Sequence, residues 1–150
     1  MAQSLTNLLT HVIFSTKDRR PFIRSEIEQN LYHYLAATAR SYKSIVHKIG
    51  GIEDHVHILL TLPKAISLSK LVEELKKGSS KWIKTNGRYY EKFAWQNGYG
   101  AFSIGQSNIT ALTKYIQNQH THHKKISFKE EYELFLKRYC VSFDEKYLWT

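Results

Sequence analysis

The run Asp54-His55-Val56-His57-Ile58-Leu59-Leu60 constrains the fold of this chain more than any other stretch. Successive side chains of a β-strand point to opposite faces, so His55 and His57 lie together on one face and the aliphatic residues that alternate with them lie on the other. The aliphatic face needs a core to cover it. The polar face presents two imidazoles side by side, and imidazole is the commonest metal ligand in proteins. The run therefore predicts a strand that carries a metal-binding pair, although a bare His-x-His also occurs at solvated strand edges.

Around this strand, apolar runs and helical stripes follow one another in the order β-α-β-β-α-β. We expect strands over 8–16, 44–51 and 55–62, a fourth strand within 95–105, and helices over 25–41, 67–85, 109–121 and 128–139. Gly50-Gly51 is interpreted as the start of the turn into the histidine strand. This order predicts an α+β fold of the ferredoxin-like or RRM-like kind: a split β-α-β antiparallel sheet with helices on one face, plus C-terminal helices. Without repeats, low-complexity segments or linkers, residues 1–150 are expected to form a single domain.

The charge of the chain points to a polyanionic partner. The formal net charge is +9 at pH 7, so nucleic acid is the first candidate and an anionic membrane surface the second. The candidate DNA-binding residues are a loop and one helix face: Lys17, Arg19, Arg20, Lys77 and Lys81. Aromatic residues among nearby cations either stack on unpaired bases or belong to the core: Tyr89, Tyr90, Phe93 and Trp95.

The location of the protein is expected to be cytoplasmic. No stretch approaches the roughly 20 apolar residues that span a bilayer, and the first residues do not have the pattern of a signal peptide.

The predicted helix after the fourth strand supplies a second set of polar side chains. Tyr115 and Gln119 are four residues apart and so share one helical face. A phenol next to a metal can attack a phosphodiester whose oxygens the metal polarises. Gln119 can add a neutral oxygen as a third ligand, which suits Mg²⁺ or Mn²⁺. Of the three histidines that follow, only His123 lies one further turn along this face, and a polar helix end is the alternative interpretation for all three.

Taken together, these motifs resemble one protein family. His55-Val56-His57 resembles the HUH motif (His, hydrophobic residue, His), and Tyr115-Ile116-Gln117-Asn118-Gln119 resembles the Y-x-x-x-Q helix of TnpA-type single-tyrosine transposases of insertion sequences that move as single-stranded DNA. Further blocks in the order typical of that family are Phe14 to Lys17, Arg19 to Pro21, Trp95-Gln96, Gly98 to Ser103 and Tyr147 to Trp149.

The resemblance implies a role for each motif residue. Tyr115 would be the nucleophile that forms a 5′-phosphotyrosine and frees a 3′-OH, and His55, His57 and Gln119 would bind the divalent metal. It also implies single-stranded DNA with hairpins at the element ends as the partner. A homodimer is implied too, whose active sites can combine the tyrosine of one chain with the histidines of the other.

Three other protein classes share part of this pattern. Histidine-triad nucleotide hydrolases need a third histidine where this chain has Leu59. Relaxases and replication-initiator nickases share HUH chemistry, and only the compact size and the matching blocks favour a transposase over them. The main alternative is a non-catalytic or domesticated RRM-like protein that binds single-stranded nucleic acid.

Overall fold

A computed structural model describes residues 2–149 and contains one four-stranded antiparallel sheet. Its strands are β1 (Leu9–Ser15), β2 (Ile45–Ile52), β3 (His55–Thr61) and β4 (Gly100–Ser103). Their order across the sheet is β2-β3-β1-β4, because α1 (Ser25–Ser41) crosses from β1 to β2 and α2 (Leu68–Ile83) crosses from β3 to β4. The predicted ferredoxin-like order is confirmed.

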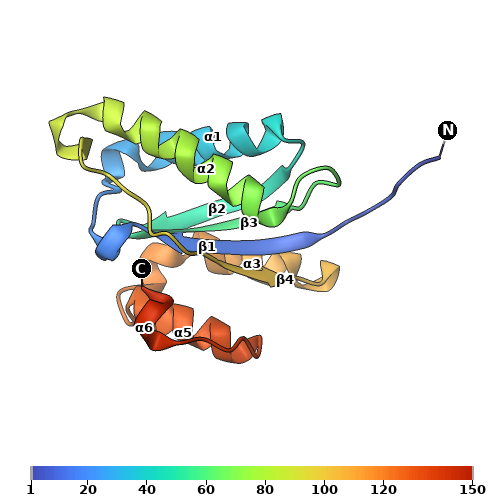
Figure 1. The fold of residues 1–150 in the computed structure, drawn as a ribbon. Helices are drawn as coiled ribbons and strands as arrows, with labels where there is room; N and C mark the ends of the chain where they lie inside the picture. The colour runs from blue at the N-terminus through green and yellow to red at the C-terminus, as the bar shows by residue number, and fades with distance from the viewer. Residues whose placement is uncertain (1, 150) are drawn as a thin grey trace.

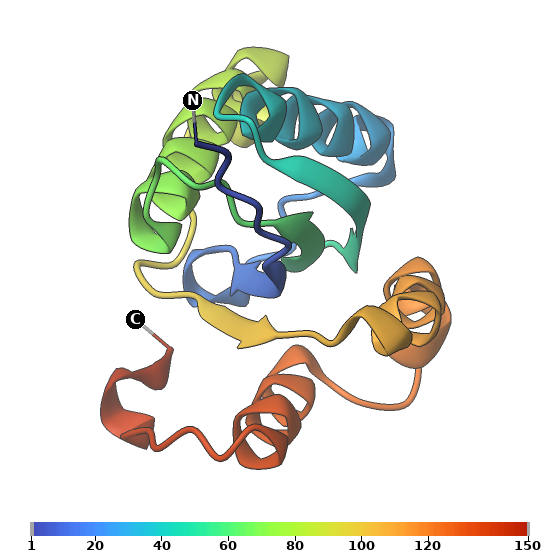
Figure 2. The ribbon, with the colours of Figure 1, turned by 90° about the vertical axis from the view of Figure 1, so that its right-hand side faces the viewer.

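The helices form a layer on each side of this sheet (Figure 1). The helices α1 and α2 cover one face. The helices α3 (Ile109–Gln117) and α5 (Phe128–Arg138), joined through the short α4 (Gln119–His122), lie side by side below the other face (Figures 1 and 2). The short α6 (Glu145–Leu148) ends the described chain. The prediction of helices on one face thus describes α1 and α2, and the C-terminal helices add a third layer.

The two faces of β3 therefore meet different surroundings. Val56, Ile58 and Leu60 are buried with residues of α1 and α2 in the larger of two apolar clusters. The smaller cluster joins Ile13 of β1 and Phe102 of β4 to the buried aromatic side of α5. His55 and His57 point to this second side, and both are fully buried. The strand alternation read from the sequence holds, but the polar face is covered by protein and not by water.

Two local predictions were wrong. Gly50 and Gly51 lie inside β2, and the turn into β3 is formed by Glu53 and Asp54. A Cβ atom on Gly50 would come within 2.3 Å of the backbone oxygen of Ile116 in α3, so this glycine permits close helix packing. The helix expected over 109–121 is interrupted at Asn118, where the backbone leaves helical geometry (φ −96°, ψ 20°).

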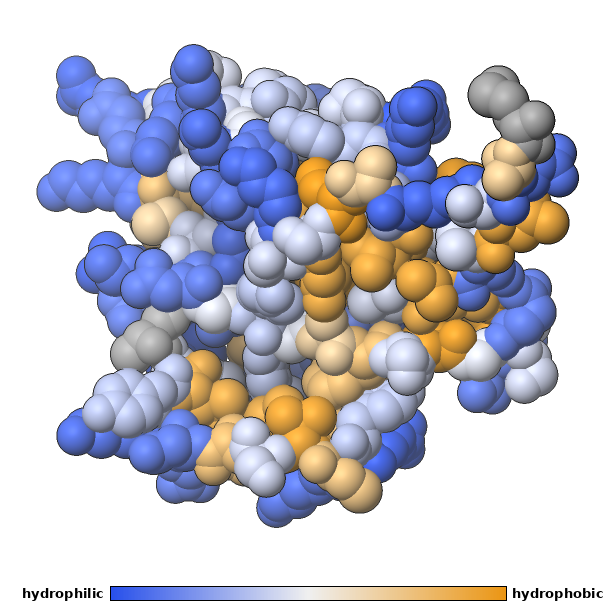
Figure 3. All heavy atoms as spheres, turned by 45° about the vertical axis from the view of Figure 1, so that its right-hand side comes forward, coloured by the Kyte–Doolittle hydropathy of each residue, from blue (hydrophilic) through white to orange (hydrophobic). Residues whose placement is uncertain are grey.

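The aromatic residues considered for base stacking fall mostly into the core. Tyr90, Phe93 and Trp95 are buried in the larger apolar cluster, whereas Tyr89 is 42% exposed. In the space-filling view, hydrophilic side chains stand out from the α1 and α2 side of the molecule (Figure 3). Within residues 2–149, no helix has the length and apolar character needed to cross a membrane.

Candidate metal centre and tyrosine nucleophile

The paired histidines of β3 converge on one carboxylate, that of Glu131 in α5. The Oε1 atom of Glu131 lies 2.9 Å from His57 Nε2 and 3.3 Å from His55 Nε2. All three side chains are buried, with exposed fractions of at most 1%. Because β3 is central in the sheet and α5 packs across its open face, side chains 74 or more residues apart in the chain meet here.

The other ring nitrogen of each histidine, Nδ1, also has a hydrogen-bond partner. His55 Nδ1 lies 2.7 Å from Asp54 Oδ1, and His57 Nδ1 lies 2.8 Å from Nε2 of His11 in β1. Metal-binding histidines almost always use their second nitrogen in this way, which fixes the tautomer and the ring direction. Both Nε2 atoms are thereby left to face Glu131. His11 Nδ1 is the one buried side-chain polar atom of the described residues without a hydrogen-bond partner.

Gln119 and His123 complete the cluster from the segment around α4. Gln119 Oε1 lies 3.0 Å from His55 Nε2 and 2.9 Å from His123 Nε2. The second ring nitrogen of His123, Nδ1, bonds to the backbone oxygen of Ile126 at 2.8 Å. The break at Asn118 does not separate Gln119 from Tyr115, because both reach the same carboxylate.

This donor set fits a metal ion. One ligand atom from each of His55, His57, His123 and Glu131 lies within 4.8 Å of the others. Buried imidazoles and a carboxylate that converge on one point, with their outer nitrogens held, have the chemistry of a divalent-metal site. His123 was the one additional histidine singled out by its spacing. Glu131 was not foreseen.

The Tyr115 hydroxyl belongs to the same cluster. It donates a hydrogen bond to Glu131 Oε2, which also accepts a bond from Gln119 Nε2 at 3.1 Å. The Tyr115 ring lies 5.9 Å from the His57 ring, centroid to centroid. The half-buried ring borders two hollows, of about 490 and 480 Å³. The candidate nucleophile is thus next to the histidine pair of its own chain and can be reached from outside.

Burial and mutual contacts shift the pKa values of His55, His57 and Glu131 in different directions. Burial by itself lowers the pKa of His55, but hydrogen bonds to Asp54 and Glu131 outweigh it and raise this pKa to about 9. Burial lowers the pKa of His57 to about 4. Burial raises the pKa of the Glu131 carboxyl, but His57, His123 and His55 lower it far below its usual range. At neutral pH a protonated His55 therefore faces an ionised Glu131.

Burial, followed by the charge and hydrogen bond of Glu131, raises the pKa of Tyr115 well above its ordinary value. The phenol is therefore neutral at physiological pH and must lose its proton during any attack.

The sequence pattern of one family covers most of this architecture. The family model described as "Transposase IS200 like" matches residues 4–119. The chain belongs to this transposase family. No curated protein matches the chain.

Two solved structures share the fold of this transposase. A candidate transposase from Deinococcus radiodurans R1 is 20% identical, with a TM-score of 0.62, over 79% of this chain and 98% of the other. A REP-associated tyrosine transposase bound to a REP hairpin is 17% identical, with a TM-score of 0.62, over 84% of this chain and 76% of the other.

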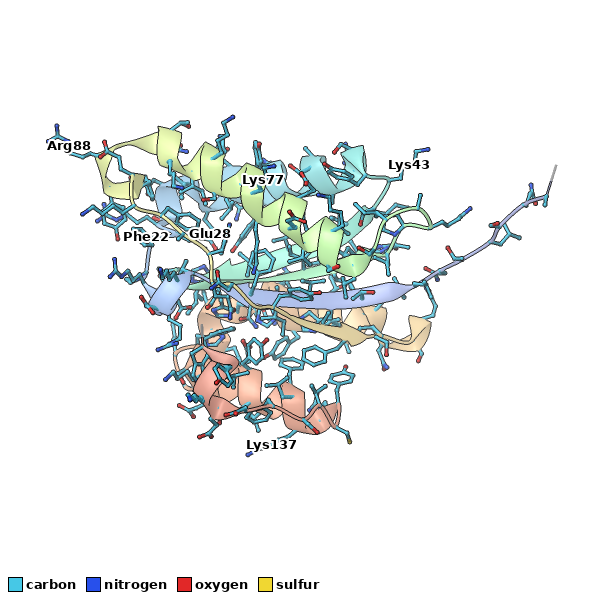
Figure 4. All side chains as sticks on the ribbon, in the orientation of Figure 1. Phe22, Glu28, Lys43, Lys77, Arg88 and Lys137 are labelled. Atoms are coloured by element: carbon cyan, nitrogen blue, oxygen red, sulfur yellow. The ribbon has the colours of Figure 1, made fainter. Side chains whose placement is uncertain are left out.

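The basic residues predicted to bind DNA occupy two places in the transposase. Lys17, Arg19 and Arg20 lie in or next to the turn after β1, which is anchored by a 2.8 Å bond from Thr16 N to the backbone oxygen of Asp54. This turn is therefore close to His55. Lys77 lies on α2, on the opposite side of the sheet from Lys137 of α5 (Figure 4). Lys77 and Lys81 are exposed and one helical turn apart, but they are separated from the histidines by the sheet.

The sequence contains a signal for Glu131, although no motif includes this residue. The buried stripe of α5 consists of Phe128, Glu131, Tyr132, Phe135 and Leu136. An acidic residue at an apolar position of an amphipathic helix is buried, and buried charges are paired or bind metals. His11 gives a weaker signal of the same kind, a histidine next to the apolar run Val12-Ile13-Phe14 of β1.

Proposed function

We propose that this transposase cleaves and rejoins single-stranded DNA at the ends of a mobile element through a 5′-phosphotyrosine on Tyr115. Membership of the family supports a DNA-cleaving transposase. One observation carries the finer proposal: a single buried carboxylate, Glu131, contacts the Tyr115 hydroxyl with one oxygen and both histidines of the HUH pair with the other. Nucleophile and metal ligands are thereby held in one cluster by the residues of one chain.

The metal would be bound by His55, His57 and Gln119, with His123 and Glu131 within reach of the same point. When bound, the ion polarises the scissile phosphate and offsets its charge. The family resemblance favours Mg²⁺ or Mn²⁺. Because several of the donors are imidazoles, we expect Mn²⁺ to bind more tightly than Mg²⁺, which prefers an all-oxygen shell.

Tyr115 performs the bond exchange in this proposal. Its phenolic oxygen forms a bond to the phosphorus while the bond from phosphorus to the 3′ oxygen breaks, and a proton then completes the free 3′-OH. The Tyr115 proton has a defined acceptor, since the hydroxyl donates to Glu131 Oε2. Later attack by a 3′-OH on the phosphotyrosine reverses these changes and joins the new strand, so no external energy source is required.

The proposed substrate is single-stranded DNA with hairpins. The solved REP-associated relative was bound to a REP hairpin, and the net charge of +9 suits a polyanion. Lys17, Arg19 and Arg20 would contact the backbone near the site, and Lys77 with Lys81 would contact a separate part of the DNA. We expect a homodimer in which each site can work with its own tyrosine, since Tyr115 and the histidines of one chain already share Glu131.

A denaturing gel tests the proposal directly. The protein is incubated with labelled single-stranded hairpin DNA from the genomic flanks of its element, with and without Mn²⁺. We expect a heat-stable, metal-dependent protein–DNA adduct that Tyr115→Phe abolishes while hairpin binding is retained. Tyr34→Phe is the matched control, because it removes a phenolic hydroxyl from α1 on the opposite side of the sheet. Hairpin binding without any adduct would favour the non-catalytic binding protein.

A further inference from the structure

The hollow of about 490 Å³ beside Tyr115, here called the α5 pocket, has an architecture of its own. It lies between Tyr115 and His122 on one side and the C-terminal half of α5 on the other. Apart from Tyr115, every residue that lines it follows residue 119, where the match to the transposase family model ends. The pocket is therefore a feature of this chain that the family pattern does not describe.

One end of the α5 pocket is cationic. Lys137 and Arg138 line it and are both exposed. The side chain of Lys137 extends from α5 into solvent (Figure 4). Arg138 is near enough to the Tyr115 hydroxyl for its charge to oppose the rise of the tyrosine pKa. A guanidinium next to a nucleophile that attacks phosphorus is the side chain best shaped to bind a phosphate, because it donates two parallel hydrogen bonds.

The other wall of the α5 pocket is apolar. Leu134 is 60% exposed although it is a large aliphatic residue, and it lines the pocket together with Phe135 and Ile126. An exposed aliphatic residue beside an aromatic ring provides a surface for the flat face of a nucleobase or for a deoxyribose. Cations at one end and an apolar wall at the other match the two halves of a nucleotide.

We propose that the α5 pocket binds the nucleotide at the cleaved bond of single-stranded DNA. Arg138, assisted by Lys137, holds the backbone phosphate beside Tyr115, and Leu134 with Phe135 contacts the adjoining base or sugar. This inference rests on the proposed function, since it assigns the substrate-binding part of the same site. Arg138 is a positioning residue: it holds the phosphate in line with the tyrosine oxygen and forms no bond to it.

The carboxylate of Glu131 also borders the α5 pocket and would repel a phosphate. Its charge is offset within the cluster, however, because its Oε1 atom faces His55, His57 and His123 at 3.3, 2.9 and 3.1 Å. A divalent ion at the same donors offsets it further. We therefore expect the α5 pocket to bind phosphate more tightly with Mg²⁺ present than without it.

An NMR titration tests the proposal. The dinucleotide d(TpT) is added to the full-length, isotope-labelled protein in Mg²⁺, so the correct hairpin sequence is not needed. We expect saturable shifts of the Arg138 side chain and of Leu134, with weaker binding of thymidine, which lacks the phosphate. Arg138→Gln should weaken the binding of d(TpT) by up to about fivefold, the upper end of the effect of one exposed ion pair, and Arg138→Lys should weaken it by less. Lys124→Gln is the control, because Lys124 is an exposed cation of the preceding turn that does not line the pocket.

Each of three results would overturn the inference. The first is saturation that shifts other surfaces and leaves α5 unchanged, the second is equal affinities of the Arg138→Gln variant and the unmodified protein, and the third is the absence of saturable binding. Failure of the proposed function is detected separately, by the denaturing gel on the unmodified protein. A protein that binds d(TpT) in the α5 pocket but forms no adduct would retain the nucleotide site and lose the phosphotyrosine mechanism.

Discussion

The substitution Gly50→Ala should separate the placement of the tyrosine from the chemistry of the site. Gly50 lies in β2, and a Cβ atom there would come within 2.3 Å of the backbone oxygen of Ile116 and 2.8 Å of its Cγ2 atom. A rotamer change can relieve the second contact but not the first. The backbone of α3 must therefore move away from the sheet, and Tyr115 is the residue just before Ile116.

The size of this movement follows from ordinary contact distances. A Cβ atom makes ordinary van der Waals contact with a neighbouring heavy atom at 3.4–4 Å, so the 2.3 Å approach to the Ile116 oxygen requires a displacement on the order of 1 Å. Overpacking of this kind costs about 1–3 kcal/mol of stability, and a misplacement of about 1 Å at a reacting group can lower the rate about 100-fold. We expect a modest loss of stability and a large loss of cleavage.

Thermal unfolding and the rate of adduct formation are the two assays for Gly50→Ala. Gly105→Ala is the matched control, since the nearest atom to a Cβ there is 3.7 Å away and the backbone is extended (φ −74°, ψ 149°). An unchanged cleavage rate in Gly50→Ala would refute the reasoning, because α3 would then not depend on the contact with β2. If Gly50→Ala fails to fold, a side chain at residue 50 disrupts the sheet itself and does not merely displace α3.

Three further outcomes are expected. The pKa of His55 is raised from an ordinary 6.5 to about 9, so the stability that its protonation contributes is complete below pH 6.5 and is lost as the pH rises through 9. Melting temperatures of the metal-free protein should therefore fall between these two pH values. A His55→Gln variant with the same pH profile of melting would contradict this explanation. Glu131→Gln should weaken Mn²⁺ binding about 10- to 100-fold by calorimetry, the usual loss when a group bonded to the metal-binding histidines is replaced, whereas Glu130→Gln, one residue away and exposed, should not. Lys77→Gln combined with Lys81→Gln should lower the salt slope of hairpin binding by about 1.4 to 1.8, for two lost phosphate contacts. The control is Lys64→Gln, because Lys64 is an exposed lysine of the loop between β3 and α2 and not of the α2 face. A double variant with the same slope as this control would show that the DNA lies elsewhere.

The sequence predicted the parts of this structure that depend on local pattern. The bounds of α1 and the two faces of β3 follow from side-chain periodicity, which is set within a few residues. Gly50 was misassigned because glycine has the same local signature in a turn and under a closely packed helix, and only the position of α3 decides between them. Glu131 was missed because its partners lie far away in the chain. Motif spacing located the histidine pair and the tyrosine but not the carboxylate that joins them.

The positions of the cluster residues in the sequence determine the order in which they appear during synthesis of the chain. Synthesis proceeds from the N-terminus at about 5–20 residues per second, and completed parts begin to fold first. His55, His57 and Tyr115 all precede α5, so they exist before Glu131 and the α5 pocket do. On the proposed mechanism, a chain still attached to the ribosome holds the histidine pair without the carboxylate that accepts the tyrosine proton. On this proposal, cleaving activity would begin only after α5 has emerged and packed onto the sheet, and incomplete copies of the chain would not cut DNA.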